Sequence, residues 1–340
     1  MNQSYCNDGN CEKNRQGEKH AAHFGSGRAT LLKLRHSPKR ITVNQINGTV
    51  YLACKGWILV IDGNTDTVIS SVMCNTKYVG LNHKTNRAYA VLEEGIAVIE
   101  TSTNKISRYL FMEQTFSQLC VDINKNLIYA ANISSESVFV IDGSSDSLIS
   151  QIKVSKKPIG IAFNSKQNKI FVTHEKSSVI FVIDCHTNST EHIDIPVPIT
   201  SINNSAEPYV SYDNNMLYVL VRSYLLDGNG GAHELDSLYV IDTISSNLVN
   251  VRNPRLDMRS QTILKNDGHE SFAVNYASGD IYLTSTSKKS LVIMNSQGEV
   301  KDNGPIKKSC IDIAINSVNN KLYLAYSSLF KKELEIKYLS

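Results

Sequence analysis

A repeated sequence unit is the feature that most constrains how this chain can fold. An apolar run that ends in Ile-Asp, or in a close variant of that pair, occurs seven times, at Ile61-Asp62, Ile99-Glu100, Ile141-Asp142, Ile183-Asp184, Ile241-Asp242, Met294-Asn295 and Ile336-Lys337. Successive copies lie 38, 42, 42, 58, 53 and 42 residues apart. A period near 42 residues in short β-rich segments is typical of propeller blades and not of a helical solenoid.

Each unit contains the same succession of short strands, which unit four illustrates. Residues 160–164 form an apolar strand, 169–173 an aromatic-bearing strand and 179–184 a third strand that ends in Ile-Asp, with polar turns between them. Val, Ile, Tyr and Phe dominate these strands, as expected for sheets that are covered on both faces. Helical periodicity is absent throughout, so the sequence predicts an all-β chain.

The second strand of the unit carries the most regular motif. It recurs as Val50–Ala53, Ala88–Val91, Ile128–Asn132, Ile170–Thr173, Leu217–Val219, Ile281–Thr284 and Leu322–Ala325. Together with the Asn-containing turn before it and the Val-Ile-Asp strand after it, this motif resembles the YVTN-repeat β-propellers, relatives of the YncE-like and lactonase-like propellers. The resemblance covers roughly residues 40–340. It implies the fold, but that family includes surface proteins, binding proteins and enzymes.

The seventh unit has only three clear strands, at 311–316, 322–326 and 333–338. A fourth strand is available upstream, at 29–35, and its pairing with the last unit would remove two exposed sheet edges. We therefore expect one domain over residues 27–340, a seven-bladed β-propeller of four-stranded antiparallel blades. Residues 28–36 would close the last blade, and residues 1–26 would form a flexible, polar, basic arm.

Charge and hydropathy limit the classes of partner. The formal net charge is +3, and residues 1–40 contain eight Lys or Arg against three Asp or Glu. The body therefore offers no general attraction to nucleic acid, and no apolar stretch is long enough to span a membrane, so we expect neither as a partner. The polar start of the chain favours a cytoplasmic protein, or a secreted or periplasmic one if a leader was removed. We expect a monomer, since a closed ring has no free edge.

Two spacings exceed 42 residues, and they are adjacent. One excess lies at 222–234, between the second and third strands of unit five, and the other at 251–267, before the innermost strand of unit six. We expect both insertions to emerge as loops on the same face of the propeller, beside the central channel. Two insertions that meet on one rim favour a lid or a pocket wall.

Histidine and glutamate pairs occur in and near these insertions. The candidate catalytic residues are His174, His233, Glu234, His269 and Glu270, because imidazole and carboxylate groups serve as general acids, general bases or metal ligands. The candidate ligand-binding residues are Arg222, Tyr224, Arg259, Tyr78 and Gln118. For any one loop residue a plain solvated side chain is the simpler interpretation, and only the clustering favours a site.

Two classes of function remain open. The first is a non-catalytic propeller that binds a small molecule, peptide or protein at the channel face, near the insertions of blades five and six. The alternative is a lyase or hydrolase acting on a lactone or cyclic ester, similar in its His and Glu content to streptogramin lyases. For a lactonase-like site, Glu94 and Asp227 are further candidates. No cofactor is expected, and a divalent metal is possible.

The two Asp-Gly-x-x-Asp segments, at 62–66 and 142–146, are predicted to be hairpin turns rather than calcium loops.

Overall fold

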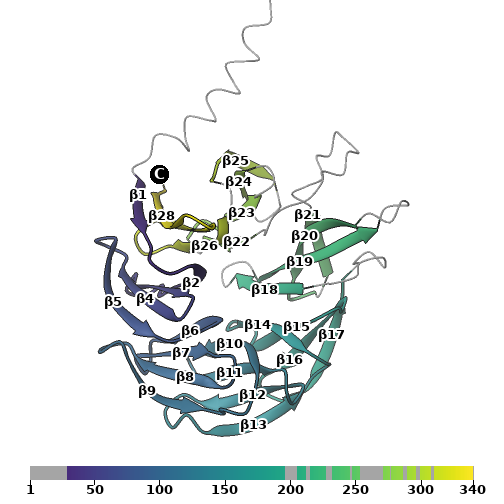
Figure 1. The fold of residues 1–340 in the computed structure, drawn as a ribbon. Coiled ribbons are helices and arrows are strands. Elements are labelled where there is room, and N and C mark those ends of the chain that lie inside the picture. The colour runs from purple at the N-terminus through teal and green to yellow at the C-terminus, as the bar shows by residue number, and fades with distance from the viewer. Residues whose placement is uncertain are drawn as a thin grey trace, which may run out of the picture.

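The computed structural model describes residues 29–195, 205–211, 215–226, 232–245, 247–252, 271–275, 277–285, 289–295, 299–307 and 310–339. Within these ranges the chain forms 28 strands and no helix, hence no helix able to cross a membrane. The strands pair into four-stranded antiparallel sheets, which Figure 1 shows arranged one after another around a central axis. The prediction of an all-β propeller with four-stranded antiparallel blades is confirmed. The predicted arm, residues 1–26, lies outside the described residues.

Six sheets are each built from four strands that follow one another in the chain. The first three contain β2 (Pro38–Val43), β3 (Val50–Cys54), β4 (Trp57–Asp62) and β5 (Thr67–Met73); β6 (Tyr78–Asn82), β7 (Arg87–Val91), β8 (Ile96–Glu100) and β9 (Lys105–Leu110); and β10 (Phe116–Asp122), β11 (Leu127–Asn132), β12 (Ser137–Asp142) and β13 (Leu148–Lys153). The next three contain β14 (Pro158–Asn164), β15 (Lys169–His174), β16 (Val179–Asp184) and β17 (Thr190–Asp194); β18 (Ser205–Ser211), β19 (Met216–Leu226), β20 (Ala232–Asp242) and β21 (Asn247–Arg252); and β22 (Phe272–Val274), β23 (Ile281–Ser285), β24 (Ser290–Met294) and β25 (Val300–Pro305).

The remaining sheet is composite, with the strand order β1-β28-β27-β26. Its strands are β1 (Ala29–Lys33), β26 (Cys310–Asn316), β27 (Lys321–Ser327) and β28 (Lys332–Tyr338). In the antiparallel β1–β28 pair, Leu32 lies opposite Leu334. The expectation of a seven-bladed propeller with residues 28–36 as the closing strand of the last blade is corrected here: six blades are built from four consecutive strands, and the remaining sheet is composite. The N-terminal segment in the composite sheet is a five-residue strand rather than all of 28–36, because past Leu34, whose N–H still donates to Lys332 O, the chain turns toward β2.

The predicted loop in unit five is also corrected. Residues 222–226 and 232–234 belong to β19 and β20, which are 11 residues long each and pair along their whole length. The insertion therefore lengthens a hairpin instead of forming a loop over the channel. Its sequence explains this outcome, since Ser-Tyr-Leu-Leu continues the apolar and aromatic pattern of the strand before it.

The core lies between neighbouring sheets. In each sheet, the strand next to the innermost one carries an aromatic side chain that is almost fully buried. These side chains are Tyr51, Tyr89, Tyr129, Phe171, Tyr218, Tyr282 and Tyr323. Tyr51 and Ile58 of the first blade, for example, pack with Ala88 and Ala90 of the next. The composite sheet packs on the first blade in the same manner, with Tyr323 and Leu334 against Leu52. The repeated motif is thus the inter-blade packing unit.

Buried ion pairs add a second kind of link between blades. Lys321, at the start of β27, donates to Asp66 Oδ1 at 2.8 Å, and Arg87, at the start of β7, lies 3.2 Å from Asp146 Oδ2. Asp66 and Asp146 end the two Asp-Gly-x-x-Asp segments, which are turns between strands, as predicted. Each turn therefore fastens its blade to the preceding sheet.

Candidate functional site

The innermost strands form the wall of a central channel. These strands are β2, β6, β10, β14, β18, β22 and β26, and they all run from one face of the propeller, here called the upper face, to the lower face. Two adjoining cavities open along the channel. The upper cavity, of about 220 Å³, is lined by residues of β2, β6, β10, β22 and β26. The lower cavity, of about 590 Å³, lies against β2, β6, β10 and the turn after β26.

A local geometry that recurs from blade to blade sets which side chains reach the upper cavity. Six of the innermost strands end at or next to a buried Asn or Asp whose side chain accepts a backbone N–H of the following turn; these residues are Asn44, Asn82, Asp122, Asn164, Asn275 and Asn316. Such side-chain turns fix the register of each strand. The residues four positions before them are Arg40, Tyr78, Gln118, Gly160, Ser271 and Asp312. Four of these six, Arg40, Tyr78, Gln118 and Asp312, line the upper cavity.

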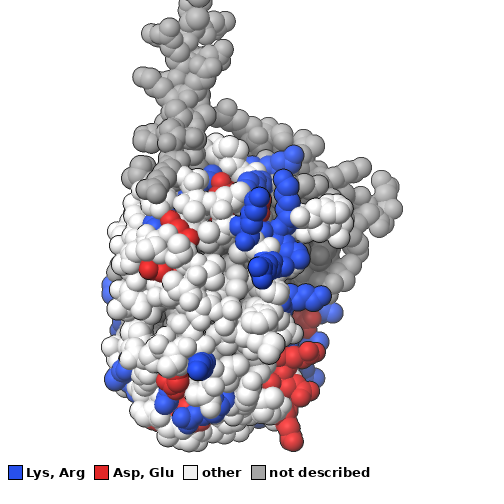
Figure 2. All heavy atoms as spheres, turned by 60° about the vertical axis from the view of Figure 1, so that its left-hand side comes forward, with Lys and Arg blue, Asp and Glu red and all other residues white. Residues whose placement is uncertain are grey.

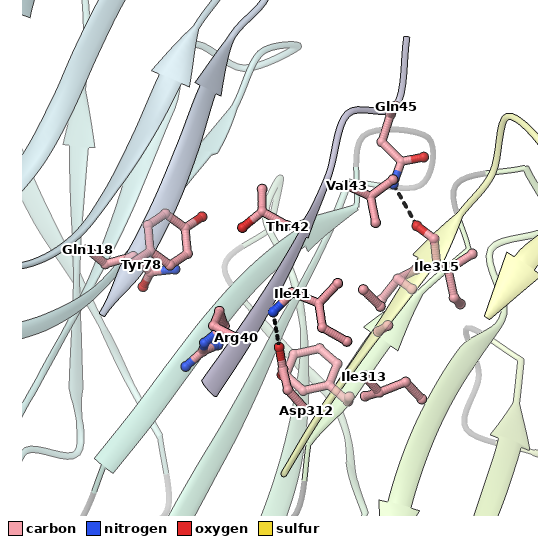
Figure 3. Close-up of a pocket in the computed structure, with 14 residues that line it drawn as sticks. Arg40, Ile41, Thr42, Val43, Gln45, Tyr78, Gln118, Asp312, Ile313 and Ile315 are labelled. Carbon is pink, nitrogen blue, oxygen red and sulfur yellow. Dashed lines mark hydrogen bonds between the residues drawn. The ribbon is translucent and has the colours of Figure 1, made fainter. Parts of the chain in front are cut away.

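Asp312 holds the wall of the upper cavity together. Its Oδ2 accepts the backbone N–H of Ile41 at 2.7 Å, and its Oδ1 accepts the hydroxyl of Ser271 at 2.9 Å. Figure 3 shows the Ile41 bond and places Arg40 between Asp312 and Tyr78. The carboxylate thus links β26 to β2 and to the residue before β22. Its hydrogen bonds give it a positioning role.

Tyr78 and Gln118 form a polar pair on the opposite side of the cavity (Figure 3). Burial raises the pKa of the Tyr78 hydroxyl, while a hydrogen bond with Gln118 and the positive charge of Arg40 act in the other direction. Gln118 Oε1 also accepts the backbone N–H of Ile161 at 3.2 Å. The phenol therefore stays protonated at neutral pH and can donate or accept a hydrogen bond.

The lower cavity is lined by more apolar side chains. Val43, Leu81, Val121 and Ile123 are half-buried there, and Val318 is half-exposed at the edge. His83 also lines it, and burial lowers its pKa, which favours the neutral imidazole. Val43, Leu81 and Val121 also pack against the cores between sheets, and the parts of these side chains that remain exposed line the cavity, where they can cover an apolar ligand.

The two cavities adjoin, because Thr42, Val43, Gln45 and Tyr78 line both. Hydrogen bonds between innermost strands hold this wall in place. Thr42 Oγ1 donates to Val79 O at 2.9 Å, and Gln45 Nε2 donates to Ile315 O at 2.7 Å. A wall tied in this way is formed before any ligand enters.

His174, one of the candidate catalytic residues, lies in a strand and not in a loop at the channel. It is the last residue of β15, only 1% exposed, and its ring lies edge-on to Phe181 with 4.9 Å between centroids. Burial lowers its pKa to about 4. It lines neither cavity. The adjacent Glu175 forms an exposed ion pair with Lys157 at 2.7 Å, and this hydrogen bond lowers its pKa.

The other sequence candidates are not gathered into one site within the part of the chain that the structure describes. Arg222, Tyr224, His233 and Glu234 lie on the long β19–β20 hairpin, where Tyr224 is opposite Glu234. Arg259, His269, Glu270 and Asp227 lie outside the described residues, and Glu94 is exposed in the turn before β8. No group of three or more His, Cys, Asp or Glu placed to hold a metal occurs among the described residues.

Of the candidate ligand-binding residues from the sequence, Tyr78 and Gln118 line the upper cavity; Arg40, Asp312 and His83, which line the two cavities, were not among the candidates. The sequence did carry a signal: in five innermost strands, a polar residue stands four positions before the Asn or Asp near the end of the strand. A polar side chain in the middle of a buried strand needs a partner or a cavity, and here the channel supplies it.

Comparisons with known proteins identify the fold alone. No protein-family model and no curated protein sequence matches this chain. Among solved structures, it is similar to the Kuenenia stuttgartiensis hydrazine synthase, with 13% identity, a TM-score of 0.69, and coverage of 87% of this chain and 94% of that one. It is also similar to the WD40 repeats of RRP9, with 10% identity, a TM-score of 0.73, and coverage of 93% and 98%. A third similar structure is the beta-propeller domain of Cps50 (Swd1) from Myceliophteria thermophila, with 10% identity, a TM-score of 0.68, and coverage of 92% of this chain and 100% of that one. These likenesses show that the chain is a β-propeller, a fold that generally suits ligand or protein binding.

Proposed function

We propose that this chain is a YVTN-type propeller that binds a small amphipathic molecule in its central channel, without transforming it. The observation that carries the proposal is the division of the channel. Its upper end presents Arg40, Tyr78 and Gln118, and its lower end presents half-buried aliphatic side chains. The joint volume is in the range of small-molecule sites, roughly 300–1,000 Å³.

The polar end defines the head group of the ligand. Arg40 contributes positive charge, and Tyr78 and Gln118 contribute hydrogen-bonding groups. Asp312, the carboxylate beside them, already accepts two hydrogen bonds. An anionic or strongly accepting head group fits this set, because charge-assisted hydrogen bonds to arginine are the strong ones.

The apolar end defines the body of the ligand. A chain or ring that displaces water from Val43, Leu81 and Val121 gains about 25 cal/mol for each Å² of apolar surface removed from water. The favoured class is therefore a carboxylic acid with an extended apolar body. The alternative of a lyase or hydrolase rested on the His and Glu set, and no observation within the described residues favours it.

A tryptophan reporter at the edge of the lower cavity tests the proposal. Val318→Trp places an indole at a half-exposed position that borders the cavity, and Val300→Trp, on the outer strand β25, is the matched control. Titration with medium-chain fatty acids should change the Val318→Trp emission saturably and leave the control unchanged. The corresponding alcohols, which lack the charge, should bind at least ten-fold more weakly.

Variants of the polar end separate specific binding from general hydrophobic adsorption. Arg40→Gln should weaken fatty-acid binding about ten-fold, and Tyr78→Phe about two- to ten-fold, whereas Lys105→Gln, on the outer strand β9, should have no effect. The proposal fails if emission never saturates, if both reporters respond alike, or if Arg40→Gln leaves the affinity unchanged while the variant keeps its melting temperature.

A further inference from the structure

The connection between β27 and β28 carries an unusual apolar tip. Leu329 and Phe330 are 91% and 94% exposed, the highest values among the large apolar side chains described. The flanking residues hold the tip in a fixed shape, because the backbone N–H of Ser328 donates to Lys331 O at 2.8 Å and that of Lys331 donates to Ser328 Oγ at 3.1 Å. The two side chains are thus presented on an ordered turn at the upper face.

The other blades provide an internal comparison. The same connection has Lys55 and Gly56 at its apex in the first blade, Glu93 and Glu94 in the second, and Ser134 and Ser135 in the third. In the fourth blade it is also polar, with Glu175 to Ser178. Of the five such connections that the structure describes, one places large apolar side chains in water. The fold therefore does not require them there.

Basic side chains surround the base of this tip. They are Lys33, Arg35, Lys307, Lys331 and Lys332, which we call the rim patch together with Leu329 and Phe330. Lys332 Nζ lies 3.4 Å from Arg35 O, and Lys307 Nζ lies 2.9 Å from Glu333. The pKa of Glu333 is lowered, first by the Lys307 hydrogen bond and further by the charges of Lys331 and Lys33, which places these groups together.

Positive charge exceeds negative charge in the rim patch. Glu333 opposes the five cations, and the next carboxylate, Glu335, accepts a hydrogen bond from Tyr326 Oη at 3.0 Å. Figure 2 shows Lys and Arg gathered on one part of this side of the molecule, with a separate acidic area below them. The net charge of the whole chain, +3, conceals this local separation.

We infer that the rim patch docks the propeller on a membrane surface that contains anionic lipids. The order of groups along the hairpin matches such a surface: the apolar tip projects farthest, toward the acyl boundary, and the cations stand behind it, at the level of the head groups. An acidic peptide would satisfy the cations, but a projecting two-residue tip offers it no groove. The inference replaces the earlier expectation of no membrane partner, which considered only net charge and spanning segments.

Vesicle binding of the full chain tests the inference. Co-sedimentation with vesicles of phosphatidylcholine and phosphatidylserine should retain the protein, whereas vesicles of phosphatidylcholine alone should retain far less, and added salt should release it. Removing both tip side chains in Leu329→Ser/Phe330→Ser should weaken binding about ten-fold or more. Lys331→Gln with Lys33→Gln should weaken it by about five-fold for each charge removed.

Matched controls use the same residue types elsewhere on the surface. Ile244→Ser changes an apolar side chain that is 71% exposed in the turn after β20, and Lys105→Gln removes an exposed cation from β9. Both variants should bind vesicles as the unmodified chain does. All variants should keep the same melting temperature, because the changed side chains lie in solvent.

Depth of insertion gives an independent readout. The emission of Phe330→Trp should shift to the blue on phosphatidylserine vesicles and be quenched by brominated acyl chains, while Ile244→Trp should show neither effect. Failure of the full chain to bind phosphatidylserine vesicles overturns the inference. So does binding that is unaffected by the tip variant, or equal capture by soluble polyglutamate, which would assign the cations to an acidic protein partner.

Discussion

The buried ion pair between Lys321 and Asp66 offers a sharp test of how the ring is held together. Lys321 Nζ lies 2.8 Å from Asp66 Oδ1, donates to Gly63 O at 2.6 Å, and lies 4.7 Å from the centre of the Tyr338 ring. The two charged side chains are only 3% and 4% exposed. The pair joins the composite sheet to the first blade, where the N-terminal and C-terminal parts of the propeller meet.

Lys321→Met keeps the aliphatic stem and removes the charge. Asp66 would then remain buried with the hydroxyl of Tyr338 as its side-chain donor. Breaking one partner of a buried pair costs about 3–5 kcal/mol. Because the Tyr338 donor persists, we expect a loss near the lower end, about 3 kcal/mol in the free energy of unfolding. For roughly 300 folded residues this corresponds to about 4–5 °C in melting temperature.

Arg87→Met is the matched control at an interface away from the composite sheet. Asp146 would keep Arg108 at 3.3 Å and the hydroxyl of Tyr89 at 2.8 Å, so we expect a loss of only about 1–2 kcal/mol. Urea unfolding, followed by circular dichroism and by the emission of Trp57, measures both losses. Adding Asp66→Asn to Lys321→Met should recover part of the stability, because it removes the unpaired charge.

The reasoning is refuted if Lys321→Met costs less than 1 kcal/mol, or if Arg87→Met costs as much. The first result would mean that the ion pair contributes no more than an apolar contact of the same size. The second would mean that the remaining partners of Asp146, Arg108 and Tyr89, do not compensate for the lost cation.

Three further predictions concern single buried sites. His174 has a pKa of about 4 in the folded protein and about 6.5 in the unfolded chain, so the unfolded chain is protonated first as the pH falls. From pH 6.5 down to pH 4, the free energy of unfolding should therefore fall by about 3 kcal/mol relative to His174→Leu. Urea unfolding at several pH values measures this loss. A Cβ on Gly80 would lie 2.0 Å from Leu119 Cδ1, so Gly80→Ala should destabilise the fold by about 1–3 kcal/mol, and a smaller cost in a Leu119→Ala background would identify this contact as the cause. Burial raises the pKa of Cys54 to about 12 and that of Cys74 to about 11, so maleimide at neutral pH should label both thiols only after denaturant is added, as mass spectrometry of peptides can show.

Much of the fold could be predicted because each blade repeats the same physical solution. The aromatic residue of the second strand, such as Tyr89 or Tyr323, packs against the neighbouring sheet in every blade, so its recurrence reports the period directly. In six innermost strands within the described residues, the turn after the strand has the same local signal, because its Asn or Asp side chain accepts a backbone N–H. Local chemistry of this kind leaves few alternatives.

The candidate site was harder to predict, because it depends on where individual side chains point. The length of the unit-five insertion indicates extra residues but not whether they form a loop or extend β19 and β20. In the sequence, His174 is a polar residue at the end of an apolar run, which is typical of the start of a loop. Only its packing against Phe181 shows that the neutral ring is part of the core. Arg40 and Asp312 are far apart in the sequence and meet only because the ring brings β2 beside β26.

The composite sheet has a consequence for how the chain acquires its structure during synthesis. Leu32 and its partner Leu334 are about 300 residues apart, so at about 5–20 residues per second β1 waits roughly 15–60 s for β28 to emerge. A strand of five residues with an exposed lysine is a poor template for pairing with other nascent chains during that delay. Ring closure is therefore the last folding event open to the growing chain. A ribosome that stalls before residue 332 leaves β1 unpaired and the edge of β27 uncovered.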